Sequence, residues 1–220
     1  MTESEPLNLR YRMVTEQIES RGIRDPRVLA AMRSVPRHVF VDPEFRAKAY
    51  TDGPLPAGHG QTISQPYIVA LMTALLRLQG GEKVLEVGTG SGYQAAILAQ
   101  LAGEVHTIEY HPELAQAARE RLAALRLDKV RVHVGDGSLG LPEQAPFQGI
   151  LVTASAPRVP APLLEQLDLG GRLVLPVGGR GGQDLRVCIR SERGIEEEVI
   201  APVAFVPLRG AYGWPEEETW

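Results

Sequence analysis

The chain has 220 residues, with 44% hydrophobic and 23% charged residues and a formal net charge of −4. This composition is typical of a soluble globular protein with one α/β domain, and no apolar run approaches the roughly 20 residues that span a bilayer. A single cysteine, Cys188, excludes an intrachain disulfide and a cysteine zinc site. The acidic balance disfavours a dedicated nucleic-acid binder, and the polar start from Met1 to Pro6 favours a cytoplasmic location over export.

Helical segments are predicted first, over an N-terminal part (residues 1–78) that packs on the core. A helix is expected over residues 7–21, with Gly22 ending it. Asp25 and Pro26 then supply an N-cap and a first-turn proline for a second helix, which runs to about Ser34.

The next segment, residues 52–66, is expected to contact substrate and cofactor. Residues 52–60 contain five glycines and prolines and are therefore predicted to form a loop. Pro66 opens a further helix, in which apolar residues recur at helical spacing.

From residue 79 to residue 210 the pattern is that of an α/β core. Strands are predicted at residues 83–87, 104–109, 130–134, 149–153 and 172–177, and helices at 94–101, from Pro112 and at 161–167. Apolar strands separated by amphipathic helices predict a parallel sheet that is covered on both faces.

The end of this core departs from the alternation. Strands at 185–190 and within 197–206 follow short turns that have no room for a crossover helix, so they are predicted to be antiparallel neighbours. We predict the strand order 3-2-1-4-5-6-7 with strand 6 antiparallel. An acidic tail (residues 211–220) follows, and the whole is expected to form one compact domain.

A glycine-rich turn directly follows the first core strand. Gly88, Thr89, Gly90 and Gly92 place flexible backbone at the carboxyl end of the sheet, where folds of this kind bind cofactors. Tyr93 stands where the dinucleotide fingerprint has its third glycine. This departure disfavours NAD(P) and favours the nucleoside of S-adenosylmethionine (SAM); the alternative is a tight turn without a ligand.

Carboxylates mark the neighbouring strand ends. Glu109 ends the second strand, where it can accept hydrogen bonds from both ribose hydroxyls. Asp136 and Gly137 follow the third strand and are candidates for the adenine edge, unless they form a simple turn. Glu86 lies inside the first strand, where burial is costly without partners. We expect it to accept hydrogen bonds from the glycine turn or from the amino group of the cofactor.

Further segments carry a family likeness. They are residues 21–23, 35–37 with 40–41, 60–66, 84–93, 153–157, 170–173 and 206–208. In these the sequence resembles the protein-L-isoaspartate (D-aspartate) O-methyltransferase family over roughly residues 13–209. The segment from Gly60 to Pro66 is the specific one, because other SAM enzymes share only the glycine turn. Gln148 and Ser155 depart from the family pattern, the first where we expect a cofactor-side contact, and the tail from Trp214 matches nothing.

The resemblance implies a class I SAM-methyltransferase fold, which is a Rossmann-like three-layer sandwich. It implies a repair enzyme that methylates the α-carboxylate of L-isoaspartyl residues and releases S-adenosylhomocysteine (SAH). It also implies that Ser64 is the active-site hydroxyl, and that Gln61, Thr62 and Ile63 lie with it against the cofactor. The backbone at Val206, Pro207 and Leu208 would bind the substrate peptide.

Three alternatives stay open. Ser64 could serve only as the cap of the following helix. The chain could be a SAM methyltransferase that acts on a small molecule or a nucleic acid, or a SAM-binding module without catalytic activity. The preferred interpretation expects L-isoaspartyl proteins and peptides as partners, a monomer, and no metal, nucleic acid or membrane.

Overall fold

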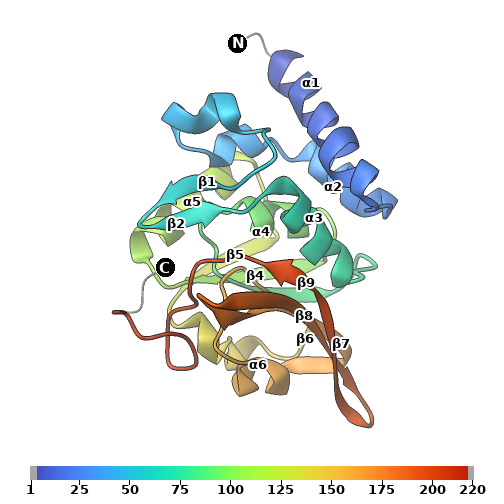
Figure 1. Ribbon diagram of the computed structural model, residues 1–220, viewed down its shortest axis with the longest axis vertical. Coiled ribbons are helices and arrows are strands. Elements are labelled where there is room, and N and C mark those ends of the chain that lie inside the picture. The colour runs from blue at the N-terminus through green and yellow to red at the C-terminus, as the bar shows by residue number, and fades with distance from the viewer. Residues whose placement is uncertain (1–3, 218–220) are drawn as a thin grey trace.

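The computed structural model describes residues 4–217, and its centre is a seven-stranded sheet in the order β5-β4-β3-β6-β7-β8-β9 (Figure 1). The strands are β3 (Lys83–Val87), β4 (Glu104–Glu109), β5 (Val130–Val134), β6 (Phe147–Val152), β7 (Leu167–Gly179), β8 (Gly182–Ser191) and β9 (Gly194–Val203). The strands from β3 to β7 pair in parallel, and β8 runs antiparallel to both of its neighbours. The predicted order 3-2-1-4-5-6-7 with strand 6 antiparallel is thus confirmed.

The alternation along the strands divides the core between the two faces of the sheet. In β3, Val84 joins a cluster with the helices α3 (Pro66–Leu75), α4 (Tyr93–Leu98) and α5 (Pro112–Ala124). Its neighbour Leu85 joins a second cluster that contains Leu163 of α6 (Ala161–Glu165). Successive side chains of a strand point to opposite faces, so one apolar run supplies both layers.

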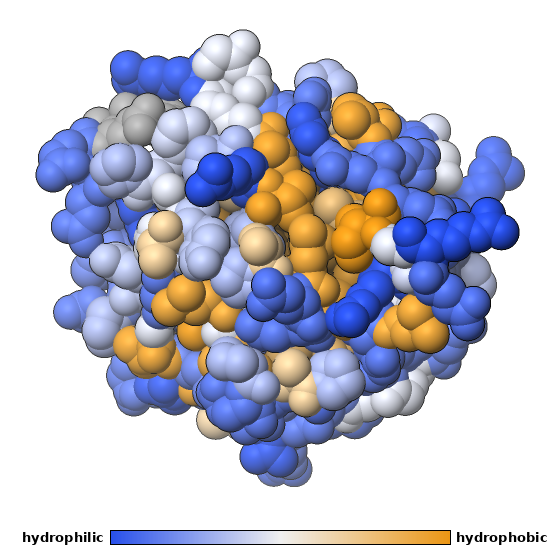
Figure 2. Space-filling model, turned by 90° about the horizontal axis from the view of Figure 1, so that it is seen from below, coloured by the Kyte–Doolittle hydropathy of each residue, from blue (hydrophilic) through white to orange (hydrophobic). Residues whose placement is uncertain are grey.

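The face of α6 is covered more thinly than the other. One short helix and irregular segments lie over it, whereas the opposite face carries the longer helices (Figure 1). From below, apolar side chains reach the surface in a patch bordered by hydrophilic ones (Figure 2).

The N-terminal helices form as the local sequence predicts. Helix α1 (Ser4–Met13) continues through a π turn and a 3₁₀ turn and ends at Gly22, whose φ is +93°. Helix α2 (Pro26–Ser34) begins after Asp25, whose carboxylate accepts hydrogen bonds from the first backbone N–H groups of the helix. Two 3₁₀ turns, Arg37–Phe40 and Pro43–Lys48, lead on to the site.

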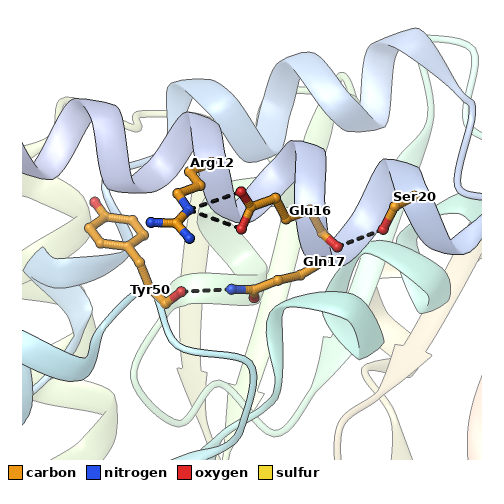
Figure 3. A network of polar contacts seen from close by, with 5 residues as sticks. All are labelled: Arg12, Glu16, Gln17, Ser20 and Tyr50. Carbon is orange, nitrogen blue, oxygen red and sulfur yellow. Dashed lines mark hydrogen bonds and ion pairs between the residues drawn. The ribbon is translucent and has the colours of Figure 1, made fainter.

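Polar contacts and a buried apolar face hold the N-terminal helical segment against the rest of the protein (Figure 3). The Gln17 side chain donates a hydrogen bond of 2.9 Å to the Tyr50 carbonyl, while Arg12 pairs with Glu16 at 2.9 Å on the outer face. Val14 and Ile18, which are fully buried, belong to the same core cluster as Val84 of the sheet. The N-terminal segment therefore shares its core with the sheet.

The prediction of a loop over residues 52–60 is wrong in its second half. Residues 55–58 form β1 (Leu55–Gly58), which pairs antiparallel with β2 (Gln61–Ile63). The glycines and prolines that suggested a loop are compatible with this hairpin. Gly58 and Gly60 adopt positive φ at its turn, and Pro56 lies in a two-stranded edge, where proline is tolerated.

The C-terminal tail lies on the sheet. Trp214 donates its backbone N–H to the Leu208 carbonyl at 2.8 Å and its indole N–H to the Ser155 carbonyl at 3.0 Å. Of the predicted tail, residues 218–220 lie outside the described residues. No helix in the described part of the chain is long and apolar enough to cross a membrane.

Candidate active site

A pocket opens at the carboxyl ends of β3, β4 and β6. Most of the predicted site residues line it: Gln61, Thr62, Ile63, Ser64, Glu86, Gly88, Thr89, Gly90, Glu109, Gly137, Val206, Pro207 and Leu208. The structure thus brings together residues from five parts of the sequence: 61–64, 86–90, 109, 137 and 206–208.

The glycine turn presents its backbone to this pocket. A Cβ on Gly88 would lie 2.3 Å from the Thr153 hydroxyl oxygen, so only glycine fits there. At Gly90, φ is +52° and the space beside the Cα is open. A ligand can therefore approach the backbone of Gly90 closely.

Glu109 closes the turn from the neighbouring strand. One carboxylate oxygen accepts the Gly90 N–H at 2.8 Å, and the other accepts the His111 N–H at 3.0 Å. Each oxygen can accept a further bond. The side chain lines the pocket at 5% exposure, so it can hold the turn and still accept bonds from a ligand.

Glu86 is the most strongly perturbed carboxyl of the site. One oxygen accepts a bond of 2.5 Å from the Thr107 hydroxyl, which lies 2.6 Å from the hydroxyl of Thr89 in the glycine turn. Within residues 4–217 the other oxygen, Oε1, has no hydrogen-bond partner. Burial raises the pKa of Glu86 to about 8, against the Thr107 bond and with help from the nearby Glu109. An unpartnered buried oxygen of this kind suits a cationic ligand group.

Two of the predicted cofactor residues lie outside the pocket lining. Gly92 precedes α4 with φ +89° and faces Ala118 and Leu122, so it serves helix packing. The Asp136 carboxylate accepts hydrogen bonds from the backbone N–H groups of Ser138 (2.9 Å) and Ala211 (2.7 Å). It is turned to the C-terminal tail, whereas its neighbour Gly137 lines the pocket.

Ser64 borders two cavities. It lines the main pocket and also a groove formed by Pro54, Gln65, Ile68 and residues 202–205. The N-cap of α3 is Gln65, and no side-chain capping bond to it is found among the described residues. The alternative in which Ser64 only caps the helix therefore lacks structural support.

The hairpin of β1 and β2 reaches across to the β4–α5 corner. The His59 ring stacks on the His111 ring with centroids 5.7 Å apart and an interplanar angle of 27°. Because Gln61 to Ser64 follow this turn directly, the stack helps to hold them against the pocket.

Several lining residues were not predicted. Tyr110 and His111 follow β4, Thr153 and Ala154 follow β6, and Arg209 follows the substrate segment. Each lies at or just beyond the end of a predicted strand or motif, and that position was the available signal. Gln148, where we expected a cofactor-side contact, instead accepts the Lys83 N–H at 2.8 Å, at the opposite end of the strands.

The site fits SAM by its own chemistry. It offers an open glycine backbone for a nucleoside, a carboxylate at the end of β4 for ribose hydroxyls, and the unpartnered Glu86 oxygen for an ammonium group. Together with the sheet order, these features define a class I SAM-dependent methyltransferase.

The comparisons with known proteins give the family. The model of the protein-L-isoaspartate(D-aspartate) O-methyltransferase family matches residues 9–213, and the chain belongs to this family. A protein-L-isoaspartate O-methyltransferase of Methanoregula boonei is 58% identical over 93% of this chain and 94% of its own length. One from Geobacter metallireducens is 54% identical over 95% and 97%.

Two solved structures are also similar to this chain. A protein-L-isoaspartate O-methyltransferase structure matches 94% of this chain and 67% of its own with a TM-score of 0.83 and 26% identity. Another, from Plasmodium falciparum in complex with S-adenosyl-L-homocysteine, matches 91% and 98% with a TM-score of 0.78 and 25% identity. The two solved structures therefore share the fold of this chain over 94% and 91% of its length.

Proposed function

We propose that this chain methylates the α-carboxylate of L-isoaspartyl residues in damaged proteins and peptides, with SAM as the methyl donor. The ester that forms closes to a succinimide, whose hydrolysis returns some normal aspartate. Family membership supports this function. The observation that carries it is the position of Ser64, where the nucleoside pocket meets a second groove.

The reaction requires little acid–base catalysis by the protein. A carboxylate is already ionised at neutral pH, so it needs no general base. SAM, when bound, supplies an electrophilic methyl group. The protein must place one carboxylate oxygen in line with that group and exclude water. The Ser64 hydroxyl is a hydrogen-bond donor at the junction of the two cavities and is the group proposed to orient that oxygen.

The cofactor is assigned to the buried end of the pocket. Glu109 is proposed to accept bonds from the ribose hydroxyls, and the free oxygen of Glu86 to accept one from the amino group. The backbone of Gly88 to Gly90 and of Gly137 would contact the nucleoside, with Gln61 to Ile63 covering it. Each of these residues lines the pocket.

The substrate peptide is assigned to the segment Val206–Leu208. Ser155 donates its N–H to the Val206 carbonyl and accepts the Leu208 N–H, both at 2.8 Å. In an extended chain, alternate residues direct their polar groups to opposite sides. The carbonyl of Pro207 therefore points away from Ser155, where a peptide backbone can reach it.

Replacing the hydroxyl tests this assignment. Ser64→Ala is expected to lower kcat for an L-isoaspartyl peptide about 100-fold, because a donor that orients an anion is lost. SAH affinity, measured by calorimetry, should stay within about threefold, since other residues hold the cofactor. Ser64→Thr retains the hydroxyl and is the matched control. Full activity of Ser64→Ala would remove Ser64 from the mechanism, and an inactive wild-type protein that still binds SAH would indicate a binding module.

We also propose that the chain acts in the cytoplasm as a monomer, without nucleic acid as a partner. The net charge of −4 supports the last point, since nucleic-acid binders carry basic surfaces. Sedimentation at micromolar concentration tests whether the chain is a monomer. A gel-shift assay with RNA tests whether it binds nucleic acid.

A further inference from the structure

The described end of the tail lies across the ends of several strands beside the proposed site. We propose that residues 209–216, called here the C-terminal strap, hold Val206–Leu208 in the conformation that binds the substrate peptide, and that Trp214 is the positioning residue of this strap. The proposal rests on the proposed function and deepens it. The family match ends at residue 213, so Trp214 lies just beyond the segment that the family model describes.

The strap is first anchored at Asp136. This carboxylate accepts the Ala211 N–H at 2.7 Å, and the Ser138 hydroxyl accepts the Tyr212 N–H at 3.0 Å. Gly210 allows this approach, because a Cβ there would lie 1.8 Å from an Asp136 oxygen. Ser138 is fully buried, so its bond to Tyr212 is shielded from water, whereas the bond from Ala211 to Asp136 is exposed.

Trp214 then connects the strap to the substrate segment. Its backbone N–H binds the Leu208 carbonyl at 2.8 Å, and its indole N–H binds the Ser155 carbonyl at 3.0 Å. That Ser155 carbonyl also accepts the Leu208 N–H. The Ser155 carbonyl thus accepts hydrogen bonds from both Leu208 and the indole of Trp214.

The indole ring of Trp214 also packs closely against the backbone. It lies over Gly179 at the end of β7, where an added Cβ would come within 3.0 Å of the ring. The ring is half-buried, so it fixes the strap by packing as well as by its hydrogen bond. Ser155 is hydrogen-bonded to Val206 and Leu208, and Trp214 is hydrogen-bonded to both Ser155 and Leu208. Trp214 therefore stabilises the pairing of Ser155 with the segment Val206–Leu208.

The strap ends at the cofactor side of the pocket. The Tyr110 hydroxyl donates a hydrogen bond of 2.8 Å to Glu216, and Tyr110 lines the pocket next to Glu109. This bond is exposed, so it contributes little free energy compared with the Trp214 contacts. The main effect of the strap is therefore expected on the peptide and only a minor one on the cofactor.

Substitution of the tryptophan separates positioning from folding. Trp214→Ala is expected to raise KM for an L-isoaspartyl peptide about tenfold, with kcat within threefold and SAH affinity within twofold. Trp214→Phe keeps a ring over Gly179 and loses only the indole N–H, so an intermediate KM is expected. Tyr11→Ala, an exposed aromatic of α1, is the control and should change nothing. If Trp214→Ala does not fold, Trp214→Phe decides the outcome by the same KM criterion.

Hydrogen–deuterium exchange of residues 204–209 gives a readout that needs no substrate. Trp214→Ala should speed exchange of the Leu208 amide at least tenfold, while amides of β4 stay unchanged. Unchanged exchange and unchanged KM would overturn the strap. If the wild-type protein does not methylate the peptide but Trp214→Ala still speeds exchange, the proposed function fails. The role of Trp214 in holding the conformation of Val206–Leu208 is then still supported.

Discussion

The two halves of the site are built in different ways. The proposed cofactor half is formed by the ends of neighbouring parallel strands, with Glu86 and Glu109 buried at 0% and 5% exposure. The proposed substrate half is assembled from Ser64, which follows β2, the segment Val206–Leu208 and the strap, which come from distant parts of the chain. The first half depends on local register, and the second depends on contacts that form only when the whole fold is in place.

If the halves are independent, variants in one should leave the other unchanged. The largest effect is expected at Glu109. Glu109→Ala removes the acceptor of the Gly90 and His111 N–H groups and of the proposed ribose contacts, and SAH affinity should fall about 100-fold. Calorimetry measures this directly. At saturating SAM the peptide KM should stay within threefold, and a large rise would show that the halves are coupled.

A smaller effect, with a distinctive pH dependence, is expected at Glu86. Burial raises the pKa of Glu86 to about 8, so the ligand-free protein carries it protonated at neutral pH. Binding an ammonium group favours the ionised form, so SAH affinity should rise between pH 6 and pH 8, by up to about tenfold per unit. Glu86→Gln cannot ionise and should show a flat profile, with affinity about tenfold below wild type at pH 8. A wild-type profile as flat as that of the variant would contradict the ammonium contact.

The same carboxyl predicts how stability changes with pH. Its pKa is raised on folding, so its favourable contribution is present below the ordinary value of 4.5 and is lost as pH rises towards 8. The melting temperature of the ligand-free wild type should therefore fall relative to that of Glu86→Gln between pH 5 and pH 8. Thermal melts of both proteins across this range check the sign. A constant difference would mean that Glu86 is not the buried acid described.

The smallest effect is expected where the halves meet. Tyr110→Phe removes the exposed hydrogen bond to Glu216 and should speed SAH dissociation about twofold to threefold. Stopped-flow measurement resolves such a change. Glu216→Gln, which retains an acceptor, is the matched comparison and should lie closer to wild type.

The sequence predicted the strands beneath the pocket well, and for a physical reason. The bounds of β3, β4 and β5 were predicted to the residue, because short apolar runs between turns allow few registers. Glu109 could be placed from its position at a strand end alone. Such features are local, so they can be read from consecutive residues.

The remainder depended on distant contacts. Asp136 was predicted for the adenine edge, but it binds Ala211, which lies 75 positions further on. The β1–β2 hairpin was predicted as loop because its glycines and prolines have the same local preferences in both structures. The role of Trp214 could not be predicted, since Gly179 and Ser155 become its neighbours only in the folded chain.

We propose above that this protein methylates L-isoaspartyl residues. The decisive experiment uses labelled SAM and two peptides that differ only in L-isoaspartate or L-aspartate at one position. We expect kcat/KM for the isoaspartyl peptide to exceed that for the aspartyl peptide at least 100-fold, with the label released by mild base as expected for a methyl ester. Equal labelling of both peptides, or of neither, would contradict it.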